Sequence, residues 1–170
     1  GDVARVVRET LAREGRIGGR EVAQVTAHDV VAAQKPAGAA FAFEAHTGDF
    51  AVPGAAGALL AGKPELILHL AAIVSGEAEA DFDKGYRINL DGTWLLLEAI
   101  RQEGIRNGAY VPRLVFTSSI AVFGAPFPEK IGDEFFHTPL TSYGTQKSIC
   151  ELLINDYTRK GLLDGISIRL

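Results

Sequence analysis

The chain has 170 residues, of which 47% are hydrophobic and 22% are charged, and its formal net charge is −4 at pH 7. This length suits one domain or part of one, and the composition is sufficient for a hydrophobic core. The scattered charges form no basic stripe that could neutralise phosphates, so we expect no nucleic-acid partner. A single cysteine, Cys150, excludes an internal disulfide and favours a reducing, cytoplasmic location.

Membrane and metal binding are not expected from the sequence. No apolar run approaches the roughly 20 residues of a membrane span, and no secretory signal opens the chain. The histidines show no metal-ligand spacing. They are His28, His46, His69 and His137.

The first part of the chain alternates helical and strand patterns. In order, we expect an amphipathic helix over 1–15 that ends at Gly15, a polar turn over 16–20, a strand over 22–27 with Asp29 just past its end, a surface loop over 32–40, and a strand over 41–47.

The remaining part continues the alternation. We expect a short helix over 53–62, a buried strand over 66–70, a helix that starts near Ser75, a long helix through Asn89, Trp94, Leu97 and Ile100 before Gly104, a buried strand over 114–116, a helix with Tyr143 and Lys147, and a strand that starts at 165. Strands that alternate with helices imply right-handed crossovers and a parallel sheet. The sequence therefore predicts a doubly wound α/β fold.

Tyr143 and Lys147 stand four residues apart on one predicted helix. This spacing places the phenol and the ammonium on one helix face, where the cation can lower the tyrosine pKa from its usual value of about 10. A tyrosine of this kind can act as a general base for an alcohol. The pair alone is also compatible with an ordinary exposed helix face. Hydroxyl groups at the carboxyl end of the preceding strand, where α/β sheets bind ligands, favour the functional interpretation.

The motif Thr117-Ser118-Ser119, then Val122-Phe123-Gly124, then Tyr143-Gly-Thr-Gln-Lys147 resembles the core of the extended short-chain dehydrogenase/reductase family, which includes epimerases and dehydratases. The resemblance implies a Rossmann fold and an NAD cofactor. It also implies catalytic roles for Ser119, Tyr143 and Lys147, with Tyr143 and Lys147 also touching the cofactor. Phe123 departs mildly from the family, in which many members have tyrosine there.

The same resemblance implies cofactor contacts in the first part of the chain. Gly1 would be the second glycine of a G-x-x-G-x-x-G/A fingerprint, although an ordinary helix N-terminus fits equally. Asp29 would bind the adenosine ribose and favour NAD over NADP, because no basic residue follows before Lys35; it could also be a turn residue. Asp49 and Phe50 would hold the adenine, or form a plain Gly-Asp turn.

Further cofactor contacts are implied near the middle of the chain. His69-Leu70-Ala71-Ala72 resembles the family's H-x-A-A strand end, so Leu70, Ala71 and Ala72 are expected to pass close to NAD. Asn89 matches the asparagine of the long helix in this family. Without that context, a mid-helix asparagine would be a solvated residue or a kink.

The segment Ser75–Arg87 is similar to that of D-erythronate dehydrogenases, family members that use NAD to oxidise a four-carbon sugar acid at C2. Ser75 would then line the substrate pocket with Ser119 and Tyr143, or it would only cap a helix. In this mechanism Tyr143 takes the hydroxyl proton while hydride leaves for the nicotinamide. A nucleotide-sugar epimerase or dehydratase with retained NAD is one alternative, and a non-catalytic NAD-binding protein is another.

The family resemblance also bears on the extent and assembly of the chain. It implies one NAD-binding Rossmann domain over 1–170, with an earlier first strand and a later substrate lobe that this chain lacks. Family members commonly form homodimers through the tyrosine helix and the long helix, so a homodimer is expected.

Overall fold

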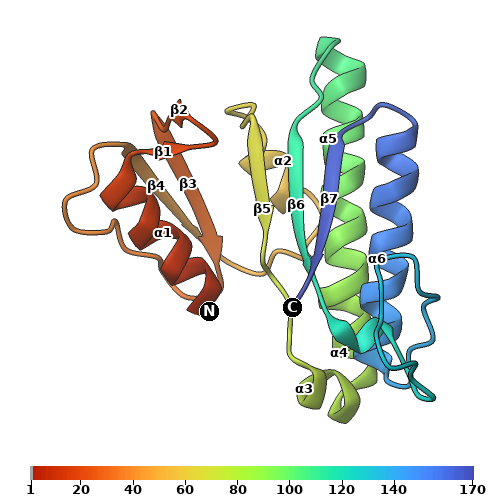
Figure 1. Cartoon of the computed structure of the whole chain (residues 1–170). Helices are drawn as coiled ribbons and strands as arrows, with labels where there is room; N and C mark the ends of the chain where they lie inside the picture. Colours follow the sequence, from red (N-terminus) through yellow and green to blue (C-terminus); the bar gives the residue numbers. More distant parts are fainter. Residues whose placement is uncertain (1) are drawn as a thin grey trace. The chain divides into compact units, whose positions relative to one another are not determined.

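A computed structural model describes residues 2–170, and Figure 1 shows its elements in chain order. Gly1, the predicted second glycine of a phosphate-binding turn, lies outside the described residues. Contacts within the chain form two compact units, residues 1–50 and residues 51–170. The expectation of a single domain stays a prediction.

The first unit combines one helix with two small pairs of strands (Figure 1). Its elements are α1 (Asp2–Glu14), β1 (Arg16–Ile17), β2 (Arg20–Glu21), β3 (Gln24–Asp29) and β4 (Ala42–Thr47). Gly15 ends α1 as predicted, with a φ of 65° that suits glycine. Strands β3 and β4 are parallel, from the pair Gln24 and Ala42 to the pair Asp29 and Thr47.

Two expectations for this unit are corrected. The polar turn expected over 16–20 contains the antiparallel hairpin of β1 and β2, whose two-residue turn uses the positive φ angles of Gly18 and Gly19. Strand β3 begins two residues later than expected, because the Val22 amide bonds to the Gly15 carbonyl instead of joining the sheet. The strand also ends later than expected, so that Asp29 is its last residue and not a residue past its end.

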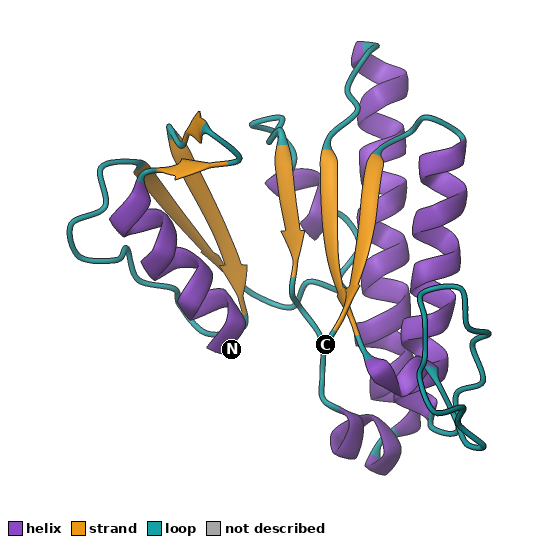
Figure 2. Ribbon diagram, viewed as in Figure 1, coloured by secondary structure: helices purple, strands orange, loops and turns teal. Residues whose placement is uncertain are grey.

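The second unit is built on a parallel sheet in the order β5, β6, β7. Its elements are α2 (Ala55–Leu59), β5 (Leu66–His69), α3 (Ser75–Ala80), α4 (Phe82–Gly85), the π-helical segment η1 (Tyr86–Asp91), α5 (Gly92–Asn107), β6 (Arg113–Ser118), the 3-10 turn η2 (Ile120–Val122), α6 (Ser142–Arg159) and β7 (Asp164–Arg169). Figure 2 shows the long helices α5 and α6 side by side along this sheet. The predicted parallel α/β arrangement is confirmed.

The core of this unit lies between the sheet and the two long helices. Leu97 and Ile100 of α5, Leu114 and Phe116 of β6, and Ile154 of α6 are at most 1% exposed. Burial of such side chains stabilises the unit by roughly 1.5–3 kcal/mol each. This packing fixes α6, and therefore Tyr143 and Lys147, against the carboxyl half of β6.

Two of the helices predicted in this unit have different ends from those expected. Helix α2 begins only at Ala55, after Gly54 with a φ of 89°. Helix α5 does not stop at Gly104 but continues to Asn107 and ends at Gly108, whose φ is 59°. A glycine inside a helix weakens it without ending it, whereas a glycine with positive φ at the cap ends it.

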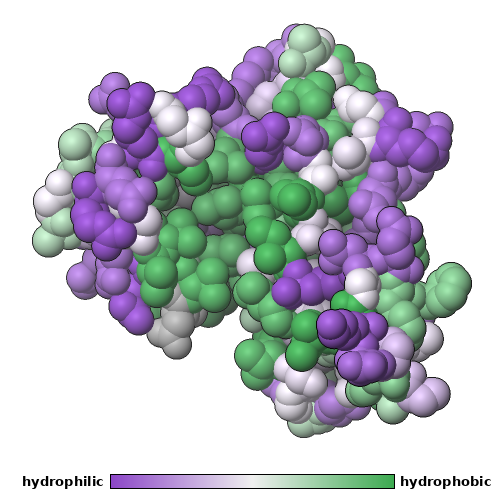
Figure 3. Space-filling view, in the orientation of Figure 1, coloured by the Kyte–Doolittle hydropathy of each residue, from purple (hydrophilic) through white to green (hydrophobic). Residues whose placement is uncertain are grey.

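Several apolar side chains remain at the surface, and the face seen in Figure 3 carries hydrophobic residues among hydrophilic ones. On β7, Ile166 and Ile168 are exposed, while the intervening Ser167 is partly buried. The two isoleucines therefore lie on the same, exposed face of the strand, because side chains two residues apart share a face. Across residues 2–170, none of the helices combines the length and the apolar character that a membrane crossing requires.

Candidate functional site

The carboxyl ends of β5 and β6 bring the predicted motifs together. The two strands are parallel neighbours, and His69 pairs with Phe116, so the residues after each of them emerge at the same edge of the sheet. The Thr117 hydroxyl also donates to the His69 carbonyl across this edge at 3.3 Å. This is the edge at which open α/β sheets bind ligands.

Ser119 and Tyr143 meet at this edge through their hydroxyl groups. Ser119 follows β6 directly, and its side-chain oxygen accepts from the Ala121 amide at 3.2 Å. The Ser119 side chain is also near enough to the Tyr143 phenol to lower its pKa. The Ala121 amide occupies one of the two lone pairs of that oxygen, and the single hydroxyl proton remains available for the tyrosine oxygen or for a substrate oxygen.

Lys147 lies one turn after Tyr143 and is almost fully buried, with 2% of its surface exposed. Its ammonium donates to the Thr117 carbonyl at 2.8 Å and lies 4.5 Å from the centre of the Phe116 ring. The centre of the Tyr143 ring is 5.6 Å away. Burial lowers the pKa of Lys147 to about 8, because the charged form loses its water.

The pKa of Tyr143 is raised, not lowered as expected. Burial is the larger influence, and the nearby Ser119 side chain opposes it only in part. Helical spacing correctly placed Lys147 on the face of Tyr143, but the ammonium is turned toward Thr117. The predicted depression of the tyrosine pKa by Lys147 is therefore wrong for the chain by itself.

The start of α6 closely approaches the turn after β6. Thr141 caps the helix by accepting from the Gly144 amide at 3.0 Å. A side-chain carbon at position 144 would lie 2.1 Å from the Ala121 carbonyl oxygen, a distance that no real contact shows. Glycine after the tyrosine thus permits the approach that brings Tyr143 to Ser119.

Asn89, which is expected to contact the cofactor, is buried and bonded within the chain. It lies in the π-helical segment η1, only 2% exposed, and both amide protons are used, toward the Ile73 carbonyl and the Gln146 side chain. Its side-chain oxygen accepts from the Ile73 amide at 2.9 Å. Asn89 therefore ties the segment after β5 to α6, and direct contact with NAD stays a prediction.

His69 is buried and neutral beside this network. The Thr93 hydroxyl donates to the Asn89 carbonyl at 2.7 Å and lies 2.9 Å from His69 Nε2. The only proton of that hydroxyl is thereby used, so Nε2 must carry a proton and donate to Thr93. Burial, with a contribution from Lys147, lowers the pKa of His69 to about 3.

Ser75 is the first residue of α3, and Val74 occupies the cap position. The alternative in which Ser75 only caps a helix is therefore wrong. Helix α3 contacts the start of α6 through Glu79, whose carboxylate accepts from the Ser142 amide at 2.5 Å. This places α3 next to the turn that carries Tyr143, and the substrate role of Ser75 stays a prediction.

Three predicted cofactor residues lie in the first unit. Asp29 ends β3, and its carboxylate accepts from the Val31 amide at 3.4 Å, a local turn contact that the sequence left open as its alternative. Asp49 and Phe50 follow β4, and the Phe50 ring lies 5.7 Å from the His28 ring. Their roles toward the adenosine stay predictions.

The segment after β5 fits a cofactor that lies along the sheet edge. Leu70 is partly buried, while Ala71 and Ala72 are exposed and small, so the backbone there is open to a ligand. The buried Lys147 ammonium supplies a cation at the same edge. These residues suit a polar group with hydroxyls, such as the ribose of a nicotinamide cofactor. Among residues 2–170, no group of three or more acidic, histidine or cysteine side chains could hold a metal ion.

Sequence reasoning missed Glu151 and Thr93, which the structure places against the predicted site. Glu151 continues the four-residue spacing of Tyr143 and Lys147 on α6. A carboxylate that repeats in register on a buried helix face was the available signal. The sequence signal for Thr93 was weaker: it is the threonine of a Gly-Thr pair that follows Asn89.

Comparison with known proteins gives consistent matches. Residues 3–170 match the NAD-dependent epimerase/dehydratase family. The D-erythronate dehydrogenase of Cupriavidus necator is 45% identical over 124 residues, which is 73% of this chain and 37% of that protein. That of Haemophilus influenzae is 50% identical over 112 residues, or 66% of this chain and 34% of that protein.

A solved structure shares the fold over the whole chain. It is a nucleoside-diphosphate-sugar epimerase from Agrobacterium tumefaciens, 57% identical, with a TM-score of 0.96 over 100% of this chain and 49% of that one. The chain thus spans about half of that structure and about a third of the two dehydrogenases.

Proposed function

The chain belongs to the NAD-dependent epimerase/dehydratase family, and from this premise we propose that its protein is a dehydrogenase that oxidises a hydroxyl group of a small sugar acid similar to D-erythronate. The observation that supports the chemistry is that Ser119 lies near enough to Tyr143 to influence its pKa, one helical turn from the buried Lys147, whose ammonium is 5.6 Å from the centre of the Tyr143 ring. The identity of 45–50% to D-erythronate dehydrogenases supports the substrate class.

In the proposed reaction, Tyr143 as phenolate takes the proton of the substrate hydroxyl. The Ser119 oxygen accepts from the Ala121 amide and keeps its proton free, and Ser119 donates that proton to the reacting oxygen and orients it. The burial that raises the tyrosine pKa also makes the phenolate a stronger base once it forms. Ser75, beside the start of α6, would contact the rest of the acid.

NAD, when bound, supplies the acceptor for the hydride that leaves the same carbon. We propose that Lys147 holds the nicotinamide ribose, with Leu70, Ala71 and Ala72 along the sheet edge. Asn89 would act by fixing that edge to α6. Asp29, Asp49 and Phe50 would hold the adenosine, and Gly1 the diphosphate.

The proposal includes a homodimer formed through α5 and α6. Trp94 and Ile105 of α5 are 48% and 64% exposed, and Leu152 of α6 is 63% exposed. Large apolar side chains on long helices are typical of surfaces that a partner covers.

A nucleotide-sugar epimerase is the second candidate. It is favoured by the strong likeness to the Agrobacterium tumefaciens protein, whose description is a nucleoside-diphosphate-sugar epimerase. The same serine, tyrosine and lysine would serve, but NAD would stay bound and return the hydride.

The first experiment follows NADH absorbance in the full-length protein supplied with NAD and a panel of short sugar acids that includes D-erythronate. We expect steady NADH formation with at least one acid. No NADH with any acid, while NAD remains bound to the purified protein, would favour the epimerase. NAD binding without turnover of sugar acids or nucleotide sugars would support the non-catalytic alternative.

A further inference from the structure

Glu151 is a buried carboxylate that the proposed reaction does not use. It lies on α6, four residues after Lys147 and eight after Tyr143, and only 3% of its surface is exposed. Leaving water costs a carboxylate several kcal/mol unless partners compensate. The partners that compensate for the burial of Glu151 therefore indicate what this carboxylate does in the structure.

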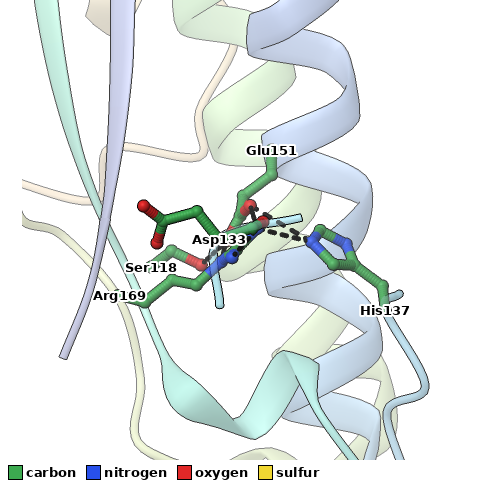
Figure 4. Close-up of polar contacts among 5 residues, drawn as sticks. All are labelled: Ser118, Asp133, His137, Glu151 and Arg169. Carbon is green, nitrogen blue, oxygen red and sulfur yellow. Dashed lines mark hydrogen bonds and ion pairs between the residues drawn. The ribbon is translucent and has the colours of Figure 1, made fainter. Parts of the chain in front are cut away.

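The partners of Glu151 come from three separate segments, and Figure 4 shows them converging on the carboxylate. The Ser118 hydroxyl donates to it from the end of β6. Arg169, the last residue of β7, donates twice, at 3.1 Å and 2.8 Å. His137, from the loop before α6, lies 3.4 Å away. Burial alone would raise the pKa of Glu151, but the hydrogen bonds from Arg169 and Ser118 lower it overall.

Arg169 is itself held from several sides. Its guanidinium donates to the Asp133 carbonyl at 3.3 Å and lies 2.8 Å from His137 Nε2. It also stacks over the Phe123 ring, 4.9 Å from the ring centre. A charge with these contacts cannot swing away from Glu151 without losing them. Glu151 is consequently a fixed anchor and not a mobile surface group.

Glu151 is bonded to the end of β6, the strand that Ser119 follows directly. Three consecutive residues of that strand end lie against three residues of α6 that repeat every fourth position. The Thr117 carbonyl accepts from Lys147, the Ser118 hydroxyl donates to Glu151, and the Ser119 side chain lies near enough to Tyr143 to lower the pKa of its phenol. Of these three links, the one through Ser118 uses no atom of the reacting groups.

We infer that Glu151 is a positioning residue, which sets the Ser119 hydroxyl against Tyr143 by fixing Ser118 on α6. Ser118 is joined to Ser119 by one peptide bond, so a shift of Ser118 moves the Ser119 oxygen directly. Small displacements of a reacting group cost large factors in rate, up to about a hundredfold for 1 Å. This inference rests on the proposed function, because it concerns the rate of that reaction.

A double-mutant cycle in the full-length enzyme tests the inference. Ser118→Ala should lower kcat about tenfold, with little change in KM for NAD, because the misplaced serine still leaves the cofactor site intact. In a Ser119→Ala background, the same change should lower kcat less than about twofold, since the residue through which Ser118 acts is already absent. A loss of equal size in both backgrounds, or no loss, overturns the inference.

Controls separate positioning from general stability. Asp164→Asn breaks the exposed ion pair between Asp164 and Arg113, which lies at the amino ends of β6 and β7, far along the strands from Ser118 and Arg169. This variant should leave kcat unchanged. Glu151→Gln keeps the shape and repeats the cycle if Ser118→Ala does not fold. Failure of both variants to fold would make the cluster a folding element and overturn the inference. Retained turnover in Tyr143→Phe would instead defeat the proposed function.

Discussion

Replacement of Tyr143 by phenylalanine is expected to lower kcat by about 10²–10⁴-fold, the usual contribution of a general base. The ring and its packing remain, so NAD affinity should be largely intact. In the wild type, oxidation should become faster as pH rises, because Tyr143 must lose its proton and burial raises its pKa. The variant should lose that rise. Steady-state rates across pH, with NAD binding followed by fluorescence, measure both effects.

The matched control is Tyr157→Phe on the same helix. Tyr157 donates to Glu98 and lies away from the strand ends, so its loss removes a hydrogen bond without touching Ser119 or Lys147. We expect near-normal kcat and an unchanged pH profile. If Tyr143→Phe behaves like Tyr157→Phe, the tyrosine is not the base.

Replacement of Lys147 by methionine should have opposite effects on activity and on stability. Activity should fall about a hundredfold or more, because the ammonium bonded to the Thr117 carbonyl is removed from the site edge. Stability of the protein without NAD should increase at neutral pH, because a buried charge is replaced by an apolar chain of similar length. The lost hydrogen bond to Thr117 offsets part of that gain.

The stability effect has a definite pH dependence. Burial lowers the pKa of Lys147 from 10.5 to about 8, so below pH 8 the folded protein carries a penalised ammonium. As pH rises from about 8 to 10.5, the folded state releases its proton before the unfolded state does, and the wild type gains stability. The advantage of methionine, at most about 3 kcal/mol, should shrink over that window.

Chemical denaturation of both forms at several pH values measures this difference. Lys160→Met, at the exposed end of the same helix, provides the control and should show no such pH dependence. A Lys147→Met protein that is less stable at neutral pH, or that keeps full activity, would contradict the account.

The parts of the site that follow from local spacing could be predicted from the sequence. The four-residue interval placed Tyr143 and Lys147 on one face of α6, and the apolar run before Thr117 predicted the strand that brings Ser119 to them. These inferences needed only the periods of helix and strand. The parallel sheet followed in the same way from the alternation of elements.

Features that depend on distant partners could not be predicted. The hydrogen bonds of Asn89 reach Ile73 and Gln146, which are 16 and 57 residues away along the chain, and no local sequence pattern predicts them. The raised pKa of Tyr143 depends on burial, which periodicity does not measure. The four-residue spacing placed Glu151 on the face of Tyr143 and Lys147, but its partners, Ser118 and Arg169, become neighbours only when β6, β7 and α6 pack together.

The most direct measurement of the central claim follows the hydride itself. Full-length enzyme would be incubated with NAD and D-erythronate that carries deuterium at C2, and the released cofactor would be analysed by mass spectrometry. The account predicts deuterated NADH in amounts that grow with each turnover, formed at least about a hundredfold more slowly in Tyr143→Phe. Cofactor that never leaves the protein, with deuterium returned to a nucleotide sugar supplied in the same way, would contradict the dehydrogenase and establish the epimerase.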